Sequence, residues 1–268
     1  MTTVAQRAPE PKKVDEGEEL GKKMKAALQK DMSNCGDPKI IEMCERLLAE
    51  FPKVADDVDA MYPLWQRHYL LIVLSEKQLV AAAAEQSAAL FEAKHQFDNT
   101  IQAALSHLQR LYSKVARFGN TSFGKRLLYK NLIFTGDVER YRDRNAQAST
   151  HEKHSHSKKQ KARFASTSAS LIDSIKSYTN AWRLQPDQGQ ACNQLAIVYE
   201  QKGRILETMY FYLRSIFASK KPFKKSLPNF TAFITRVPRE LLGNPIPSDA
   251  DDPLASVSLM EQELVLMA

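Results

Sequence analysis

Apolar residues recur along most of the chain at intervals of three or four positions, the spacing of one face of an α-helix. The pattern predicts a first helix through residues 20–32 and a second through 38–51. Between them, Asp37 is a good helix cap and Pro38 suits the first helical position. The chain has only nine glycines, whereas sheet proteins need frequent turn glycines, so the predicted fold class is all-α.

Three further long helical patterns follow in the central part of the chain. They cover residues 58–84, 101–118 and 122–144. Strong helix formers fill the interval between the first two, and we expect a turn somewhere in 84–98. This arrangement predicts long antiparallel helices joined by short connections.

The later part of the chain, from residue 171 to 217, has the spacing of tetratricopeptide units, which pair two helices in about 34 residues. Small residues are expected where paired helices cross, and Gly203 allows the turn between them. The markers of one repeat end are Tyr178, Ala181 and Pro186, and those of the next repeat are Leu195, Ala196, Tyr199, Gly203, Thr208, Tyr212 and Ser215.

Polar segments suggest the domain limits. Residues 1–17 are expected to be a disordered tail, 18–240 a helical domain with a disordered basic insertion at about 145–168, and 241–268 a linker with a possible terminal helix. The insertion contains His151, His154 and His156. Histidines in such a Ser/Lys tract lack an oriented set of neighbours, so we expect no metal site.

Composition adds constraints on function. The net charge of +7 fits an acidic partner, either a phosphorylated peptide or nucleic acid, or only a basic loop on an ordinary surface. The three cysteines form no C-x-x-C pair, and the chain has no signal-peptide core or stretch of about 18 apolar residues. We therefore expect a cytoplasmic or nuclear protein that does not contact membranes. No phosphate loop, G-x-S-x-G or H-E-x-x-H motif is present, so we expect no enzyme and no cofactor.

Two segments resemble a known family. Residues 136–142, GDVERYR, and residues 190–216, QACNQLAIVYEQKGRILETMYFYLRSI, are similar to the Est1/SMG family of telomerase-associated proteins and nonsense-mediated mRNA decay adaptors. The specific match covers roughly residues 124–236. ETMYFYLRSI looks closer to the SMG-five branch and NQLAIVYEQKG closer to the SMG-seven branch, so the branch stays open.

The resemblance implies a 14-3-3-like array of about nine antiparallel helices. It also implies an adaptor that forms a heterodimer with a related SMG-family adaptor, binds the phosphorylated RNA helicase of mRNA decay and recruits mRNA degradation. Such a protein acts in the cytoplasm, with shuttling to the nucleus left open. The implied phosphopeptide-binding residues are Arg140 as guanidinium fork, Tyr141 as hydroxyl donor, Asn193 as a holder of the peptide backbone and Lys77 as a second cation.

One position departs from the family pattern. Leu70 stands where related domains carry a lysine, five residues after the tryptophan of Leu64-Trp65. Because a missing cation could cost a few kcal/mol of phosphate affinity, the site could bind weakly or leave only the dimer role. Arg140 also has acidic neighbours in sequence, so it could instead belong to salt bridges on a solvated helix face.

A second function also fits the residues. Basic runs at 158–163 and 220–225 could contact nucleic-acid phosphates, as in a telomerase-associated protein of the Est1 type. We rank it second, because no aromatic platform of the kind used by single-strand binders is evident within these runs.

Overall fold

A computed structural model describes residues 11–30, 35–85, 89–150 and 171–236. Within these ranges the chain forms helices and no strand, which confirms the all-α class. In chain order the helices are α1 (Pro11–Lys30), α2 (Pro38–Glu50), α3 (Pro52–Asp57), α4 (Met61–Ala84), α5 (Leu90–Ala116), α6 (Ser122–Thr150), α8 (Ile172–Leu184), α9 (Gly189–Gln201), α10 (Ile205–Ile216) and α11 (Ser226–Arg236).

The chain divides into two compact units, residues 1–227 and 228–268. In the second unit only residues 228–236, the greater part of α11, are described. The first unit contains all other described helices and every candidate site residue. No described helix has the length and apolarity needed to cross a lipid bilayer.

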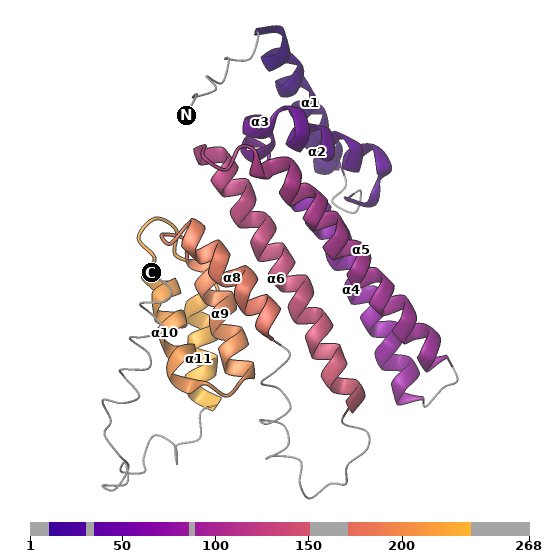
Figure 1. Cartoon of the computed structure of the whole chain (residues 1–268), viewed down its shortest axis with the longest axis vertical. Coiled ribbons are helices and arrows are strands. Elements are labelled where there is room, and N and C mark those ends of the chain that lie inside the picture. Colours follow the sequence, from indigo (N-terminus) through magenta and orange to yellow (C-terminus); the bar gives the residue numbers. More distant parts are fainter. Residues whose placement is uncertain (1–10, 31–34, 86–88, 151–170, 237–268) are drawn as a thin grey trace, which may run out of the picture. The chain divides into compact units, whose positions relative to one another are not determined.

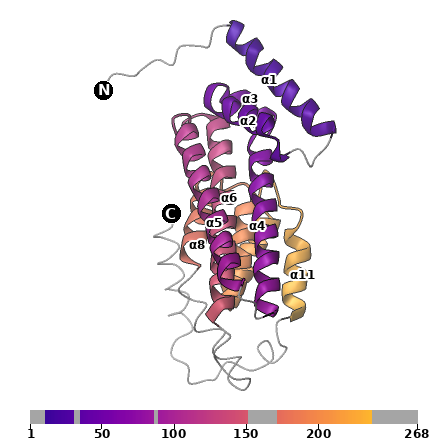
Figure 2. The same cartoon turned by 90° about the vertical axis from the view of Figure 1, so that its right-hand side faces the viewer.

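The long helices α4, α5 and α6 run side by side with alternating direction, as Figures 1 and 2 show. The turn predicted near residues 84–98 is confirmed, since α4 ends at Ala84 and α5 begins at Leu90. Apolar side chains at helical spacing fill the space between these helices. Fully or almost fully buried examples are Ile72, Leu79, Ile101, Leu108, Leu111, Val115, Leu127 and Ile133.

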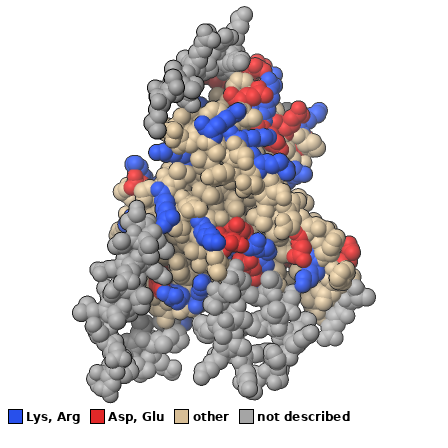
Figure 3. Space-filling model, in the orientation of Figure 1, with Lys and Arg blue, Asp and Glu red and all other residues tan. Residues whose placement is uncertain are grey.

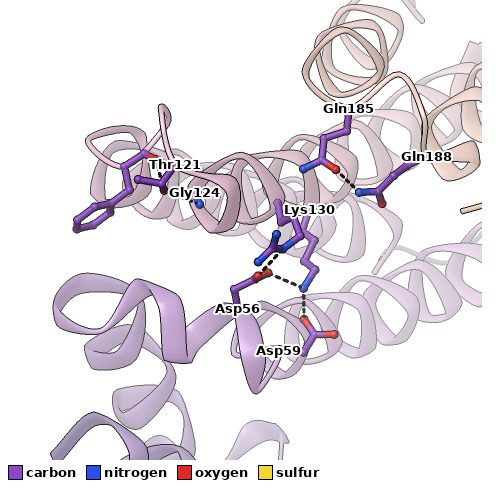
Figure 4. Close-up of polar contacts among 9 residues, drawn as sticks. Asp56, Asp59, Thr121, Gly124, Lys130, Gln185 and Gln188 are labelled. Atoms are coloured by element: carbon purple, nitrogen blue, oxygen red, sulfur yellow. Dashed lines mark hydrogen bonds and ion pairs between the residues drawn. The ribbon is translucent and has the colours of Figure 1, made fainter. Parts of the chain in front are cut away.

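The start of α6 is fixed by a cap and by ion pairs. The hydroxyl of Thr121 accepts a hydrogen bond of 3.0 Å from the backbone N–H of Gly124, which satisfies one of the free amides of the first turn. The ammonium of Lys130 lies 3.5 Å from the carboxylate of Asp56 and 3.1 Å from that of Asp59 (Figure 4). These contacts tie α3 and the turn after it to α6.

Close contacts join α6 to α8 and α9 to α10. A Cβ atom on Gly136 of α6 would lie 2.5 Å from the ring of Tyr178, so no larger residue fits this crossing without movement. Ala196, Thr208 and Ser215 are fully buried, as the tetratricopeptide pattern predicts. Gly203 has a φ of 71° in the turn between α9 and α10, which confirms its predicted role.

Several predicted boundaries differ from the structure. Helix α1 begins at Pro11, although residues up to 17 were expected to be a tail. Within this helix the ammonium of Lys23 lies 2.7 Å from the carboxylate of Glu19, one turn earlier. Short α3 was not predicted, and α6 continues to Thr150, beyond the expected start of the insertion. Residues 1–10, 151–168 with their histidines, and 237–268 lie outside the described residues.

Candidate functional site

A buried carboxylate stands at the centre of the contacts between α6, α8 and α9. The Oδ1 atom of Asp137 accepts hydrogen bonds of 2.7 Å from the Tyr178 hydroxyl and 2.9 Å from the Gln194 amide. The guanidinium of Arg140 lies 3.6 Å from the same oxygen. Burial raises the pKa of Asp137, and the charge of Arg140 and the Tyr178 bond oppose that rise. One oxygen therefore connects three helices.

Arg140 is oriented by this carboxylate. Its Nε donates a hydrogen bond of 3.4 Å to the Tyr178 hydroxyl, and its side chain is 18% exposed. Burial acts to lower the pKa of Arg140, but the larger combined effect of Tyr178 and Asp137 raises this pKa above its ordinary value. The guanidinium therefore stays charged. With five N–H donors, the guanidinium still has capacity for an anionic ligand after these two contacts. The alternative that Arg140 belongs to a salt bridge on a solvated helix face does not hold, because its contact with Asp137 is mostly buried.

The neighbouring arginines do form the ion pairs that sequence suggested as an alternative. Arg142 lies 3.1 Å from Asp143 and 3.0 Å from Asp173, and Arg144 pairs with Glu76 of α4. Their charges are therefore compensated locally, which leaves Arg140 as the arginine of this group aimed into the junction of α6 and α8.

Tyr141 faces α4. Its ring lies 6.3 Å from that of Tyr69 in an edge-on arrangement, and the guanidinium of Arg144 lies 4.7 Å from its centroid. One helical turn earlier on α4, Trp65 stacks on Phe134 of α6 with centroids 4.9 Å apart. These aromatic contacts pack α4 against α6.

Lys77 and Leu70 lie seven residues apart on α4, so they share one face of this helix. Lys77 is exposed and makes no ion pair with any residue that the structure describes. Leu70 is 47% exposed, so a lysine at this position would also reach solvent. At position 70 this chain therefore lacks the lysine of related domains on an accessible surface, and Leu70 is not a core residue.

Asn193 is on α9, and its side chain is 2% exposed. Its Oδ1 accepts a hydrogen bond of 3.2 Å from the hydroxyl of Ser226, so the amide contributes to internal packing. The next residue, Gln194, contacts Asp137 and was not identified from the sequence. The signal was present, because Gln194 belongs to the Asn-Gln-Leu-Ala segment and Asp137 to GDVERYR.

The structure therefore places Arg140 and Tyr141 on α6 between the helices that carry Lys77 and Asn193. It records no direct contact among Arg140, Lys77 and Asn193 within the described ranges. Their joint role in phosphate binding stays a prediction. No group of three His, Cys, Asp or Glu among the described residues could hold a metal ion, and the three cysteines are buried and form no disulfide within these residues.

Comparison with known proteins gives matches to a family and to a curated protein. Residues 174–261 match the family described as "Est1 DNA/RNA binding domain". The chain is also 30% identical over 105 residues to "Nonsense-mediated mRNA decay factor SMG7" from Danio rerio. That second match covers 39% of this chain and only 7% of the zebrafish protein. Together the two matches confirm the resemblance to the Est1/SMG family and leave the SMG-five or SMG-seven branch unresolved.

Proposed function

We propose that this chain is a non-enzymatic adaptor of nonsense-mediated mRNA decay that binds a phosphorylated peptide with side chains of α4 and α6. The observation that carries the proposal is Arg140, which Asp137 and Tyr178 orient next to Tyr141 on a helix of the family motif. A rigid, charged guanidinium beside a phenol hydroxyl suits the oxygens of a phosphate ester. The phosphorylated helicase of mRNA decay is the proposed ligand.

The fold of the proposed adaptor is a 14-3-3-like helical array, and its place of action is the cytoplasm. The similarity to a decay factor supports this assignment, while the motif residues on α6 support the location of the site. Leu70 implies that Arg140 and Lys77 bind the phosphate without a third cation. We therefore expect weak binding, with micromolar or higher dissociation constants.

Substitution at position 70 tests the phosphopeptide site. We expect Leu70→Lys to strengthen binding of a synthetic phosphoserine peptide about tenfold, because one charge-assisted bond adds about 1.5–3 kcal/mol before its costs. Arg140→Gln should abolish the preference for the phosphorylated peptide over its unphosphorylated twin. Isothermal titration calorimetry with both peptides measures these changes.

Leu206→Lys is the matched control, because it adds the same charge at an exposed position of α10, a helix that carries none of the proposed binding residues. It should change the affinity little. Equal binding of both peptides by the unaltered chain and by Leu70→Lys, or no binding to either, would remove the phosphopeptide part of the proposal.

Pairing with a related adaptor is the second part of the proposal. A mixture of this chain with an SMG7-type partner should give a complex with the summed mass in size-exclusion chromatography with light scattering. Each chain measured alone is the control for self-association. If the mixture elutes as the two separate species at micromolar concentration, the heterodimer proposal fails while the phosphopeptide site can still stand.

A nucleic-acid-binding role is the second candidate, favoured by the loop between α10 and α11. Phe217 at its start is 78% exposed, and all four lysines at 220, 221, 224 and 225 are exposed. Backbone hydrogen bonds of 2.9 Å from Gly189 to Lys221 and 3.1 Å from Lys221 to Asp187 fix the loop. An exposed ring beside lysines is the combination that single-strand binders use.

This candidate predicts salt-dependent binding of an oligouridine. Replacing Lys224 and Lys225 with glutamine should lower the slope of log affinity against log salt by about 0.7 for each phosphate that the protein no longer neutralises. Phe217→Ala should weaken binding about tenfold with an unchanged slope, because stacking on a ring carries no counterion release. Fluorescence anisotropy measures both effects. If none of the three substitutions changes the affinity, the loop between α10 and α11 is not a nucleic-acid-binding site.

A further inference from the structure

A polar pocket lies between α4 and α5 and contains none of the residues of the proposed phosphopeptide site. Its volume is about 600 Å³, inside the range of about 300–1,000 Å³ that is typical of ligand sites. Its lining on α5 extends from Glu92 to Arg110. At 1.5 Å per residue this stretch is about 27 Å long, which corresponds to about eight residues of extended peptide.

A buried pair of histidines stands near one end of the pocket. The Nε2 atom of His68 lies 2.7 Å from the Nδ1 atom of His107, so one ring donates a hydrogen bond to the other. The Nε2 atom of His107 lies 3.2 Å from Glu45 but is not well aligned with it, although this side chain is only 7% exposed. A ligand oxygen in the pocket would give this nitrogen a better-aligned partner than Glu45 provides.

Two arginines flank the same end. Arg67 from α4 and Arg110 from α5 line the pocket, and neither forms an ion pair within the part of the chain that the structure describes. Glu45 cannot compensate both, because its carboxylate already lies 2.9 Å from the ammonium of Lys114. The end of the pocket near the histidines therefore has an excess of positive charge.

The field of these cations reaches the histidine pair. Burial lowers the pKa of His68 to about 4, and the charges of His107, Arg67 and Arg110 contribute to that lowering. Burial also lowers the pKa of His107, against a rise caused by Glu45. Both rings are thus neutral near pH 7 and can gain a proton if an anion enters.

We propose that this pocket binds an acidic peptide segment, with a carboxylate or phosphoryl group between Arg67 and Arg110 and in hydrogen-bond contact with His107. The remainder of the lining suits a peptide backbone, because Gln96, Asn99 and Thr100 offer uncharged donors and acceptors. Glu92 at the far end gives the pocket an opposite polarity there, which favours one direction of the bound peptide. The site uses different residues from the proposed phosphopeptide function and does not depend on it.

Proton linkage gives this site a signature. The groups that face His107 are Glu45 from α2, Arg67 and His68 from α4, and Arg110 from α5. An anion favours the protonated ring, so the pKa of His107 is higher in the complex than in the free protein. Binding therefore takes up a proton, and it strengthens as the pH falls from the pKa of His107 in the complex towards its lowered pKa in the free protein.

The test is a titration of the full chain with inorganic phosphate and with an eight-residue glutamine peptide that carries three glutamates at one end. Histidine side-chain NMR signals report on His68 and His107 directly. We expect saturable shifts with at least one probe, and a lower dissociation constant at about pH 6 than at about pH 8. Phosphate alone would identify a phosphoryl ligand, and the glutamate peptide alone a carboxylate.

Two variants complete the experiment. Replacing Arg67 and Arg110 together with glutamine should raise the dissociation constant about tenfold or more, while circular dichroism verifies the helical fold. Arg140→Gln should leave these shifts unchanged, which separates this pocket from the phosphopeptide site. An absence of saturable shifts, equal affinity after replacement of both arginines, or disappearance of the shifts in Arg140→Gln would each overturn the proposal.

Discussion

The carboxylate of Asp137 is the interaction on which the arrangement of the later helices depends. It is buried where α6 meets α8 and α9, and a buried charge without partners costs several kcal/mol. Tyr178, Gln194 and Arg140 supply these partners from the three helices. A displacement of α8 or α9 would therefore remove the Tyr178 or the Gln194 hydrogen bond from this buried carboxylate. Because Tyr178 also accepts a hydrogen bond from Arg140, helix packing and the orientation of Arg140 are coupled.

The same helix α6 contacts α4 through aromatic rings and ion pairs, so α4 connects two regions of different chemistry. Towards α6 it presents Trp65 and Tyr69, and towards α5 it presents His68. On the face shown in Figure 3, acidic and basic side chains lie next to one another around an uncharged centre. The two proposed anion sites therefore depend on individual arginines, Arg140 in one and Arg67 with Arg110 in the other, and not on a large basic surface on this face.

Much of the fold followed from apolar periodicity. The helical character of α5 and α6, the turn before α5 and the small residues between α9 and α10 were predictable because each depends on residues close in sequence. The start of α1 and the short α3 were not, because the charged α1 lacks a strong apolar stripe and α3 has only six residues. Local patterns are weakest for such segments.

The site was predictable only in part. Family resemblance predicted Arg140 and Tyr141 as binding residues, and this role stays a prediction. The contact between Asp137 and Tyr178 was not predicted, because the two residues are 41 positions apart and nothing in the local pattern indicates that they meet. The pocket between α4 and α5 was missed for a similar reason, since His68 and His107 belong to two separate helices. Asn193 shows the reverse difficulty: its position matches the motif, yet its side-chain oxygen contacts Ser226 inside the protein.

The most direct test of the central role of Asp137 is a double-mutant cycle on the free energy of unfolding, measured with denaturant. The cycle uses Asp137→Ala, Tyr178→Phe and the combination of both. A central hydrogen bond between α6 and α8 predicts a coupling of about 1–3 kcal/mol between the two changes. Additive effects, within about 0.5 kcal/mol, would show that the two side chains act independently and would contradict the account.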